Sequence, residues 1–290
     1  MSERKAHAAL VVVFLVWGTT FLAIRIALET MPPFLLASFR WMAAGTLLSV
    51  GLVLRGERLP PPRSWGSLAV LGVLLLAVGN GGVVWAEQYV PSGLTAVLVA
   101  ITPFWMVGID AVMPRGERLT VRRVVGLMVG FAGIVTLVWP EIRFGSSPGF
   151  LRGVMAAQLG CVGWAIGSTY ARTRRHAENV LATVALEMLF GGLFLLLLGL
   201  LRHEWAVLVV NPRTLGALMY LVIAGSIVGF SAFAYALKHL PVATVSLHGY
   251  VNPVIAVILG TLVMNEPFGW RMGVSAVAVL IGIWLVRSRH

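Results

Sequence analysis

The side chains best suited to bind a small molecule lie inside long apolar segments of this chain. Trp17, Trp105 and Trp164 each fall near the middle of such a segment, away from the ends where indole rings usually meet interfacial water. A buried indole N–H needs an acceptor, which a polar cavity or a substrate would supply. Contact with lipid or a neighbouring helix is the alternative for each ring. We expect these three tryptophans to contribute to substrate binding.

Four polar residues also lie deep in apolar segments. Asn80 belongs to the run GNGG, Thr20 follows Trp17 by three residues, and His248 and Asn252 are one helical turn apart. Polar groups at such depth are costly unless they face a cavity or another helix. We expect all four to be candidates for substrate binding, with hydrogen bonding between helices as the alternative, favoured for Thr20. A proton-coupling role for His248 is a further hypothesis.

Two similar stretches, 89–105 and 239–255, each place a proline deep in an apolar segment, at Pro103 and Pro253. A proline inside a helix leaves the carbonyl one turn earlier without its donor and bends the helix. The freed carbonyls would either contact a ligand or permit a gating motion. A repeated, interrupted membrane helix is typical of the midplane binding site of a transporter.

The extramembrane stretches lack the motifs of enzymatic chemistry. They contain no glycine-rich phosphate loop, no cluster of metal ligands and no serine–histidine–acid arrangement. The single cysteine, Cys161, excludes an intrachain disulfide and a multi-cysteine metal site. We therefore expect no enzymatic activity, no cofactor and no metal. A membrane enzyme acting on lipids would need acids or histidines clustered at one interface, and a scaffold subunit would not need the paired prolines.

Composition places the chain in the bilayer. Hydrophobic residues make up 59% of its 290 residues, charged residues 11%, and the mean hydropathy is +0.91. A soluble domain carries about a quarter charged residues. The net charge of +11 does not indicate nucleic-acid binding, because the basic residues sit at the ends of apolar runs rather than on one polar face. The expected partner is a lipid bilayer.

Ten apolar segments approach the length of about 20 residues that crosses a bilayer. They cover residues 8–28, 34–55, 66–88, 92–113, 121–139, 150–170, 182–201, 214–236, 242–264 and 270–287. The linker-like stretch 140–149 divides them into two sets of five. Because five is odd, homologous halves would be inverted repeats. We predict an all-α integral membrane protein with ten transmembrane helices as two inverted five-helix repeats, at 1–140 and 150–290.

Two further patterns concern these halves. Trp17 corresponds to Trp164, and Gly79 corresponds to Gly229, which supports the repeat. Basic residues concentrate in the connections that would be cytoplasmic if the N-terminus is cytoplasmic, so both termini are predicted on that side. Arg40 is expected near the outer end of the second span. The first segment is too long for a signal peptide and lacks its cleavage site, so it is interpreted as a retained span.

Three stretches resemble a known family: WGTTFLAIR at 17–25, the helix pair at 101–138, and its partner at 251–286. They are similar to the EamA repeats of the drug/metabolite transporter superfamily, most of all to the YddG-type exporters of aromatic amino acids. The resemblance covers nearly the whole chain. It implies ten helices, inverted repeats, and export of amino acids or similar metabolites. The turn PRGERLT at 114–120 departs from the family in carrying more arginine.

The residues and the resemblance together favour a secondary exporter of aromatic or other bulky neutral amino acids. An aromatic cavity with a few neutral polar groups and no strong fixed charge suits a zwitterion with an apolar side chain. Export of other small metabolites or drugs is the alternative. No carboxylate lies at the middle of the first span, which disfavours efflux of quaternary ammonium compounds. The protein is expected in the cell inner membrane, where a monomer is sufficient. The expected cavity-lining segments are 8–28, 66–88, 92–113, 150–170, 214–236 and 242–264.

Overall fold

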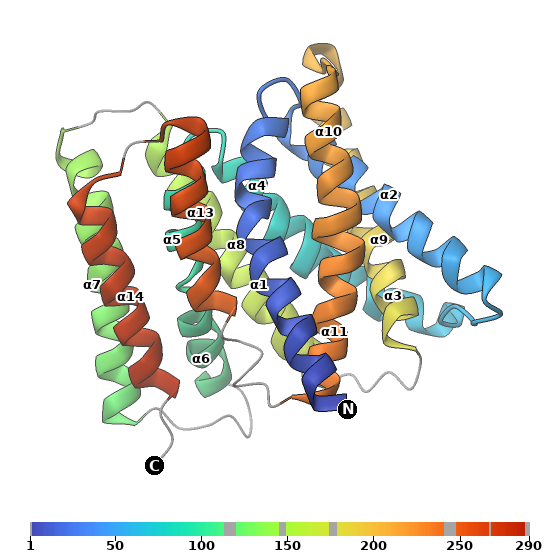
Figure 1. Cartoon of the computed structure of the whole chain (residues 1–290), viewed down its shortest axis with the longest axis horizontal. Helices are drawn as coiled ribbons and strands as arrows, with labels where there is room; N and C mark the ends of the chain where they lie inside the picture. The colour runs from blue at the N-terminus through green and yellow to red at the C-terminus, as the bar shows by residue number, and fades with distance from the viewer. Residues whose placement is uncertain are drawn as a thin grey trace.

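The computed structural model describes residues 2–112, 120–144, 149–173, 179–240, 248–266 and 268–287, and within these ranges every element is a helix (Figure 1). The elements of the first half are α1 (Ser2–Ala27), α2 (Pro33–Leu54), α3 (Pro62–Leu71), η1 (Gly72–Asn80), α4 (Gly81–Ala86), α5 (Ser92–Val99), α6 (Thr102–Val112) and α7 (Val121–Phe144). Those of the second half are α8 (Phe150–Thr173), α9 (Val180–Leu201), η2 (Glu204–Val207), α10 (Pro212–Tyr220), η3 (Leu221–Val228), α11 (Gly229–His239), α13 (His248–Met264) and α14 (Trp270–Arg287).

The helices fit a protein that crosses a membrane several times. Within the described ranges, 6 helical segments are long and apolar enough to span a bilayer, and shorter apolar helices occupy Ser92–Met106, Val124–Thr136, Val251–Met264 and Trp270–Gly282. The all-helical membrane class is thereby confirmed, while the count of ten spans stays a prediction. The start of the predicted helix 242–264 and most of the turn 114–120 lie outside the described residues.

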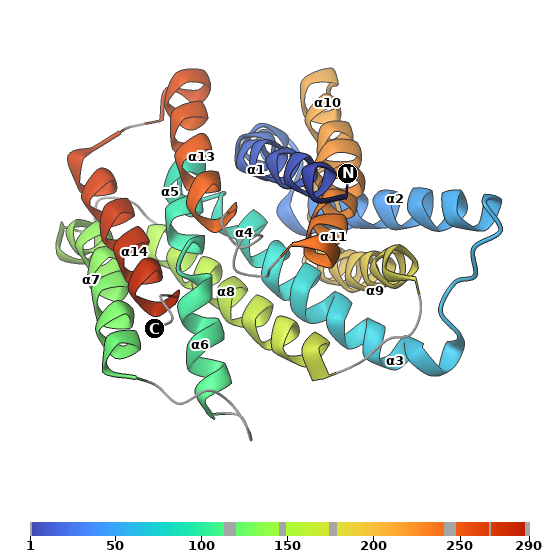
Figure 2. The same cartoon turned by 60° about the horizontal axis from the view of Figure 1, so that its bottom comes forward.

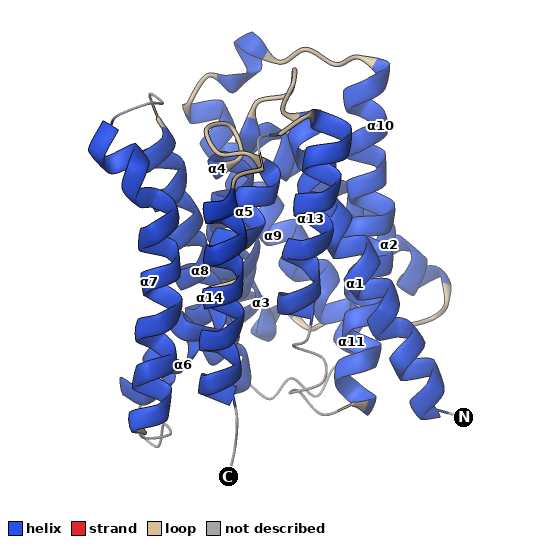
Figure 3. Ribbon diagram, turned by 60° about the vertical axis from the view of Figure 1, so that its left-hand side comes forward, coloured by secondary structure: helices blue, strands red, loops and turns tan. Residues whose placement is uncertain are grey.

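The helices lie side by side, and most of the described loops lie at one end of the bundle (Figure 3). α7 and α14 pack against each other at one edge, α2 packs against α9 at the other side, and α1 packs against α13 and α11 (Figures 1 and 2). The start of α1 and the end of α14 lie at the same end of the bundle (Figure 1). On α7, apolar side chains such as Met128 are exposed, as expected for a helix that faces lipid.

Two composite helices have the same build. α3–η1–α4 and α10–η3–α11 each begin with a proline, pass through a π-helical stretch and continue as α-helix. At the end of each π stretch a glycine N–H donates to the carbonyl five residues earlier, Gly81 to Leu76 and Gly229 to Ala224. π-Helical turns are rare and frequently occur at functional sites. Their presence in both halves was not predicted from the sequence.

Two helices that begin after a proline are capped by carboxylates from the second half of the chain. Pro32 and Pro91 offer no side-chain cap to α2 and α5. At α2, the Leu35 N–H donates to Glu204 Oε2 at 2.9 Å, and burial raises the pKa of Glu204 above its ordinary value. At α5, backbone N–H groups of the first turn donate to the carboxylate of Glu266. Carboxylates at these positions satisfy otherwise unpaired N–H groups and complement the helix dipole.

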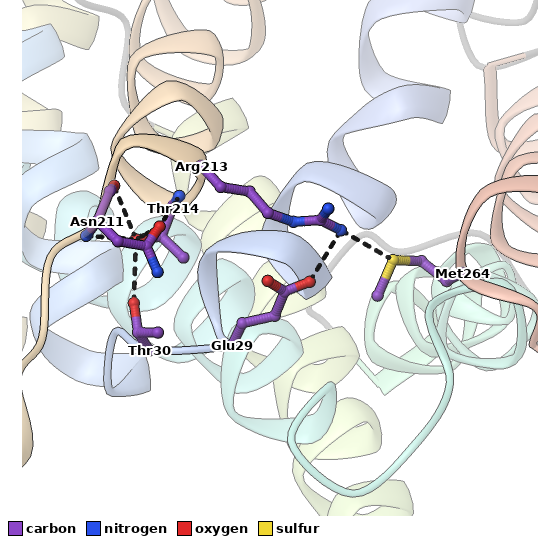
Figure 4. Close-up of polar contacts among 6 residues, drawn as sticks. All are labelled: Glu29, Thr30, Asn211, Arg213, Thr214 and Met264. Carbon is purple, nitrogen blue, oxygen red and sulfur yellow. Dashed lines mark hydrogen bonds and ion pairs between the residues drawn. The ribbon is translucent and has the colours of Figure 1, made fainter.

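A further polar cluster joins the end of α1 to the start of α10 (Figure 4). Asn211 caps α10 by accepting from the Thr214 N–H at 2.9 Å, and the Thr30 hydroxyl donates to the Thr214 hydroxyl at 3.0 Å. Arg213 forms an ion pair with Glu29 at 3.0 Å. These contacts fix the position of α1, whose middle borders the cavity described next.

Candidate functional site

A cavity of about 220 Å³ lies between α1, α2, η1, α4, α5, α6, α8, α11 and α13. These elements include all six segments that we expected to line a cavity, and they add α2, which we did not expect. Of the predicted site residues, those that line the cavity are Trp17, Thr20, Asn80, Pro103, Trp164, His248, Asn252 and Pro253. Trp105 is not among the lining residues.

Aromatic rings form the wall around Trp17. Its indole N–H donates to the carbonyl of Gly225 at 3.1 Å. Its ring centre lies 5.1 Å from the rings of both Phe230 and Phe233 and 5.3 Å from His248, whose ring stands nearly perpendicular to it. Aromatic rings prefer such tilted and edge-to-face contacts. The acceptor of the Trp17 N–H is therefore a backbone carbonyl, and the ring lines the cavity.

Trp17 and Trp164 pack on corresponding glycines. A Cβ atom on Gly229 would lie 2.5 Å from Trp17 Nε1, and one on Gly79 would lie 3.3 Å from Trp164 Cε3. Any larger residue at Gly229 would collide with the indole. The first-half tryptophan thus rests on the second-half glycine, and the second-half tryptophan rests on the first-half glycine.

Two of the predicted polar residues already have backbone partners. The Thr20 hydroxyl donates to the carbonyl of Trp17 at 2.7 Å within its own helix, rather than to another helix. With its amide nitrogen turned toward α1, Asn252 donates to the carbonyls of Phe14 and His248, both at 3.2 Å. Asn252 therefore links α13 to α1 at the margin of the cavity.

Trp105 differs from the other two tryptophans of the prediction. Its indole N–H donates to Gln158 Oε1 on α8 at 3.0 Å, and its ring stands perpendicular to that of Phe131 at 5.7 Å. The sequence placed Trp105 far from a membrane interface but did not reveal this acceptor on a distant helix. Gln158 also donates to the carbonyl of Leu98 at 3.3 Å, so it joins α8 to both α5 and α6.

Arg40 is a cavity residue that we did not predict. We expected it near the outer end of a span, which stays a prediction, and we expected no strong fixed charge in the cavity. The second expectation is wrong, because the Arg40 side chain is only 3% exposed and lines the cavity. Nε donates to Ser226 Oγ at 2.9 Å, and Nη1 lies 3.5 Å from Asn80 Oδ1. The available signal was an arginine two turns inside an apolar segment, since such charges usually face a bundle interior.

Glu87 lies close to this region without lining the cavity. The residue is completely buried at the end of α4, and neither carboxylate oxygen has a hydrogen-bond partner. Its backbone carbonyl accepts a hydrogen bond from Arg25 Nη1. Glu87 and Arg40 interact electrostatically, but no ion pair joins them. The sequence indicated only that Glu87 lies near a helix end.

The fold and the cavity define a helical membrane protein with a partly polar cavity between helices of both halves. The profile of the EamA-like transporter family matches residues 4–139 and again residues 151–288. The chain therefore belongs to the EamA-like transporter family. This result confirms the predicted superfamily and the class of membrane transporter.

Similar proteins cover nearly the full length. YedA of Escherichia coli strain K12, an uncharacterized inner membrane transporter, is 36% identical over 278 residues, covering 94% of this chain and 89% of YedA. YvbV of Bacillus subtilis strain 168, an uncharacterized transporter, is 25% identical over 287 residues, covering 98% and 93% of the two chains. A protein of known crystal structure with 22% identity aligns with a TM-score of 0.66 over 99% of this chain and 97% of its own, a likeness of fold alone.

Proposed function

We propose that this chain exports amino acids, especially aromatic or other bulky neutral ones, by alternating access around the central cavity. The observation that carries the proposal is the composition of the cavity wall. Flat aromatic faces of Trp17, Trp164 and Phe230 are combined with the polar groups of Arg40 and Asn80. A mostly apolar pocket with a few placed polar groups is typical of a site for a small molecule with an apolar body and a polar end.

The proposed mechanism uses two inverted repeats, at 1–140 and 150–290. The reciprocal contacts of Trp17 with Gly229 and of Trp164 with Gly79 support this relation. The π-helical stretches η1 and η3 also support it, because they occupy corresponding places in the two halves. In inverted-repeat transporters, rocking of one repeat against the other opens the midplane site alternately to the two sides. A monomer encloses the whole cavity and would suffice.

The proposed location is the cell inner membrane with both termini in the cytoplasm. The description of the relative YedA as an inner membrane transporter supports the membrane assignment. The shared end of the bundle at which α1 starts and α14 ends is consistent with termini on one side (Figure 1). The distribution of basic residues supports the cytoplasmic side for that end.

A flux measurement in proteoliposomes tests the proposal. We expect uptake or release of labelled phenylalanine, tryptophan or threonine that depends on the protein. Replacing the cavity-lining Ala100 by phenylalanine should reduce this flux strongly, because the new ring occupies cavity volume. The matched control is Leu262→Phe, on a side chain that is 74% exposed. Absence of protein-dependent flux for every amino acid would reject amino-acid export.

The alternative is export of another small metabolite or a drug. The same aromatic wall favours any compound with a flat apolar body, so the cavity alone does not separate these substrates. A negative amino-acid panel combined with increased drug tolerance of cells that produce the protein would favour the alternative.

A further inference from the structure

We propose that Arg40 forms an anion subsite in the cavity, and that this subsite selects apolar monocarboxylates whether or not they carry an amino group. The inference rests on the proposed function to the extent that the cavity is the transport site. It goes further by naming the chemical group that the cavity recognises.

The first argument is the missing counterion of Arg40. Its partners at hydrogen-bond distance, Ser226 and Asn80, are both neutral, and no ion pair to it is found in the described parts of the chain. A guanidinium offers five N–H donors in a planar fork that matches a carboxylate. Burying a charge without an opposite charge is costly, and a bound carboxylate in the cavity would supply that charge.

The second argument is the position of the guanidinium. Arg40 Cζ lies 4.3 Å from the ring centre of Trp41, which is itself 1% exposed and packed edge-on against Phe230. This cation–π contact and the bond to Ser226 hold the fork in one place. The Trp41 indole N–H has no acceptor either, and Trp41 lines the cavity beside Arg40. An unpartnered donor next to a guanidinium favours a ligand that brings acceptor oxygens.

The third argument concerns the opposite charge of an amino acid. No acidic residue is found among the described residues that line the cavity. The amide nitrogen of Asn252 is engaged with two backbone carbonyls, and its remaining oxygen is a neutral acceptor. An ammonium group would therefore have no carboxylate partner in the cavity, whereas an apolar body would contact Trp17 and Trp164. Recognition should depend on the carboxylate and only weakly on the amino group.

A different explanation is that Arg40 merely balances the buried charge of Glu87. The two groups interact electrostatically, but no hydrogen bond or ion pair connects them, and Glu87 does not line the cavity. The two explanations differ in their predictions. If Arg40 only compensates Glu87, then Glu87→Gln should make Arg40 dispensable. If Arg40 binds substrate, the Arg40→Gln/Glu87→Gln protein should fold and still fail to bind carboxylates.

The test compares three probes on the purified full-length protein in detergent, with binding followed by the fluorescence of the cavity tryptophans and by competition. Phenylalanine has both charged groups, 3-phenylpropanoate has only the carboxylate, and phenylalaninamide has only the amine. We expect 3-phenylpropanoate to bind within a few-fold of phenylalanine. Phenylalaninamide should bind about 10- to 100-fold more weakly, the range expected for loss of charge-assisted hydrogen bonds.

Variants assign the effect to Arg40. Arg40→Gln should weaken the binding of phenylalanine and of 3-phenylpropanoate about 10- to 100-fold and leave the binding of phenylalaninamide unchanged. Arg40→Lys should retain part of the preference for carboxylates, since lysine keeps the charge but lacks the planar fork of donors. Arg25→Gln is the matched control, because Arg25 is a nearby arginine that does not line the cavity. It should keep the preference for carboxylates. If Arg40→Gln fails to fold, the comparison of the three probes on the unsubstituted protein still tests the preference for carboxylates.

Several results would overturn the subsite: equal binding of phenylalanine and its amide, binding of no apolar carboxylate at all, or restoration of carboxylate binding to Arg40→Gln by Glu87→Gln. Failure of the proposed function appears differently. Arg40-dependent binding of 3-phenylpropanoate without flux of any amino acid would reject amino-acid export and retain the subsite. Amino-acid flux that is unchanged in Arg40→Gln would retain amino-acid export and reject the subsite.

Discussion

Pro103 and Pro253 lie in similar sequences, yet the chain passes them in two different ways. In the first half the helix stops before Pro103, with α5 ending at Val99 and α6 beginning at Thr102. In the second half α13 begins at His248 and continues through Pro253 to Met264. Both prolines line the cavity. The same residue pattern therefore gives a helix break just before the proline on one side of the cavity and a helix that passes through the proline on the other.

Side chains from the surroundings explain how the break is tolerated. The carbonyl of Val99 accepts from the Thr102 hydroxyl at 2.6 Å, and that of Leu98 accepts from Gln158 at 3.3 Å. A break in the membrane is costly unless the freed carbonyls find such donors. On the α13 side, Asn252 donates to the carbonyl of His248 from within the same helix. Side-chain donors thus accompany the proline on both sides, and those near Pro103 make its break tolerable.

The largest effect is expected from removing the donor at the break. Gln158→Leu would leave the Leu98 carbonyl and the Trp105 N–H without partners. Each buried unpaired group costs about 1–3 kcal/mol, so the thermal midpoint in detergent should fall by several degrees. Gln88→Leu is the matched control, because Gln88 donates only to the carbonyl of Trp85 in its own turn. An unchanged midpoint in Gln158→Leu would contradict the role assigned to this glutamine.

The two prolines themselves should respond unequally. Pro253→Ala restores an N–H donor inside a continuous helix, where proline costs up to about 3 kcal/mol, so it should raise the midpoint and slow flux. Pro103 is the second residue of α6, a position that tolerates proline well, so Pro103→Ala should change stability by less than about 1 kcal/mol. Thermal unfolding and proteoliposome flux of both variants provide the measurement. Equal changes of midpoint and flux in the two variants would contradict the different roles assigned to the two prolines.

A smaller effect is expected where the end of α13 holds the start of α5. Glu266 accepts from the Ser92 N–H at 2.8 Å and from the Gly93 N–H at 3.0 Å. Glu266→Gln keeps one acceptor but loses the charge. We therefore expect the free energy of unfolding to fall by about 1 kcal/mol and the flux to change. Glu204→Gln is the control. It removes a carboxylate that caps α2 away from the cavity and whose charge is already disfavoured by burial. If both variants behave alike, the Glu266 contact has no special part in transport.

Much of the cavity could be anticipated from Trp17, Asn80, Trp164 and His248, because each is an exception to the apolar pattern around it. Trp105 shows the limit of this reasoning: the same kind of exception is satisfied by Gln158, more than fifty residues later in the chain. Arg40 shows a second limit. We counted it only as a topology signal and did not predict that its charge would line the cavity. Binding by these residues stays a proposal.

The sequence by itself determined the membrane class, the apolar segments and the family, since these depend on composition and on local pattern. Only the tertiary structure decided which polar side chains meet one another. Lipid and a dry helix interface select nearly the same apolar residues, so periodicity cannot distinguish a cavity wall from either. The hydrogen-bond partners of Arg40 come from η1 and η3, which are far apart in the chain. Only the packing of these helices places a guanidinium without a carboxylate partner beside the aromatic wall.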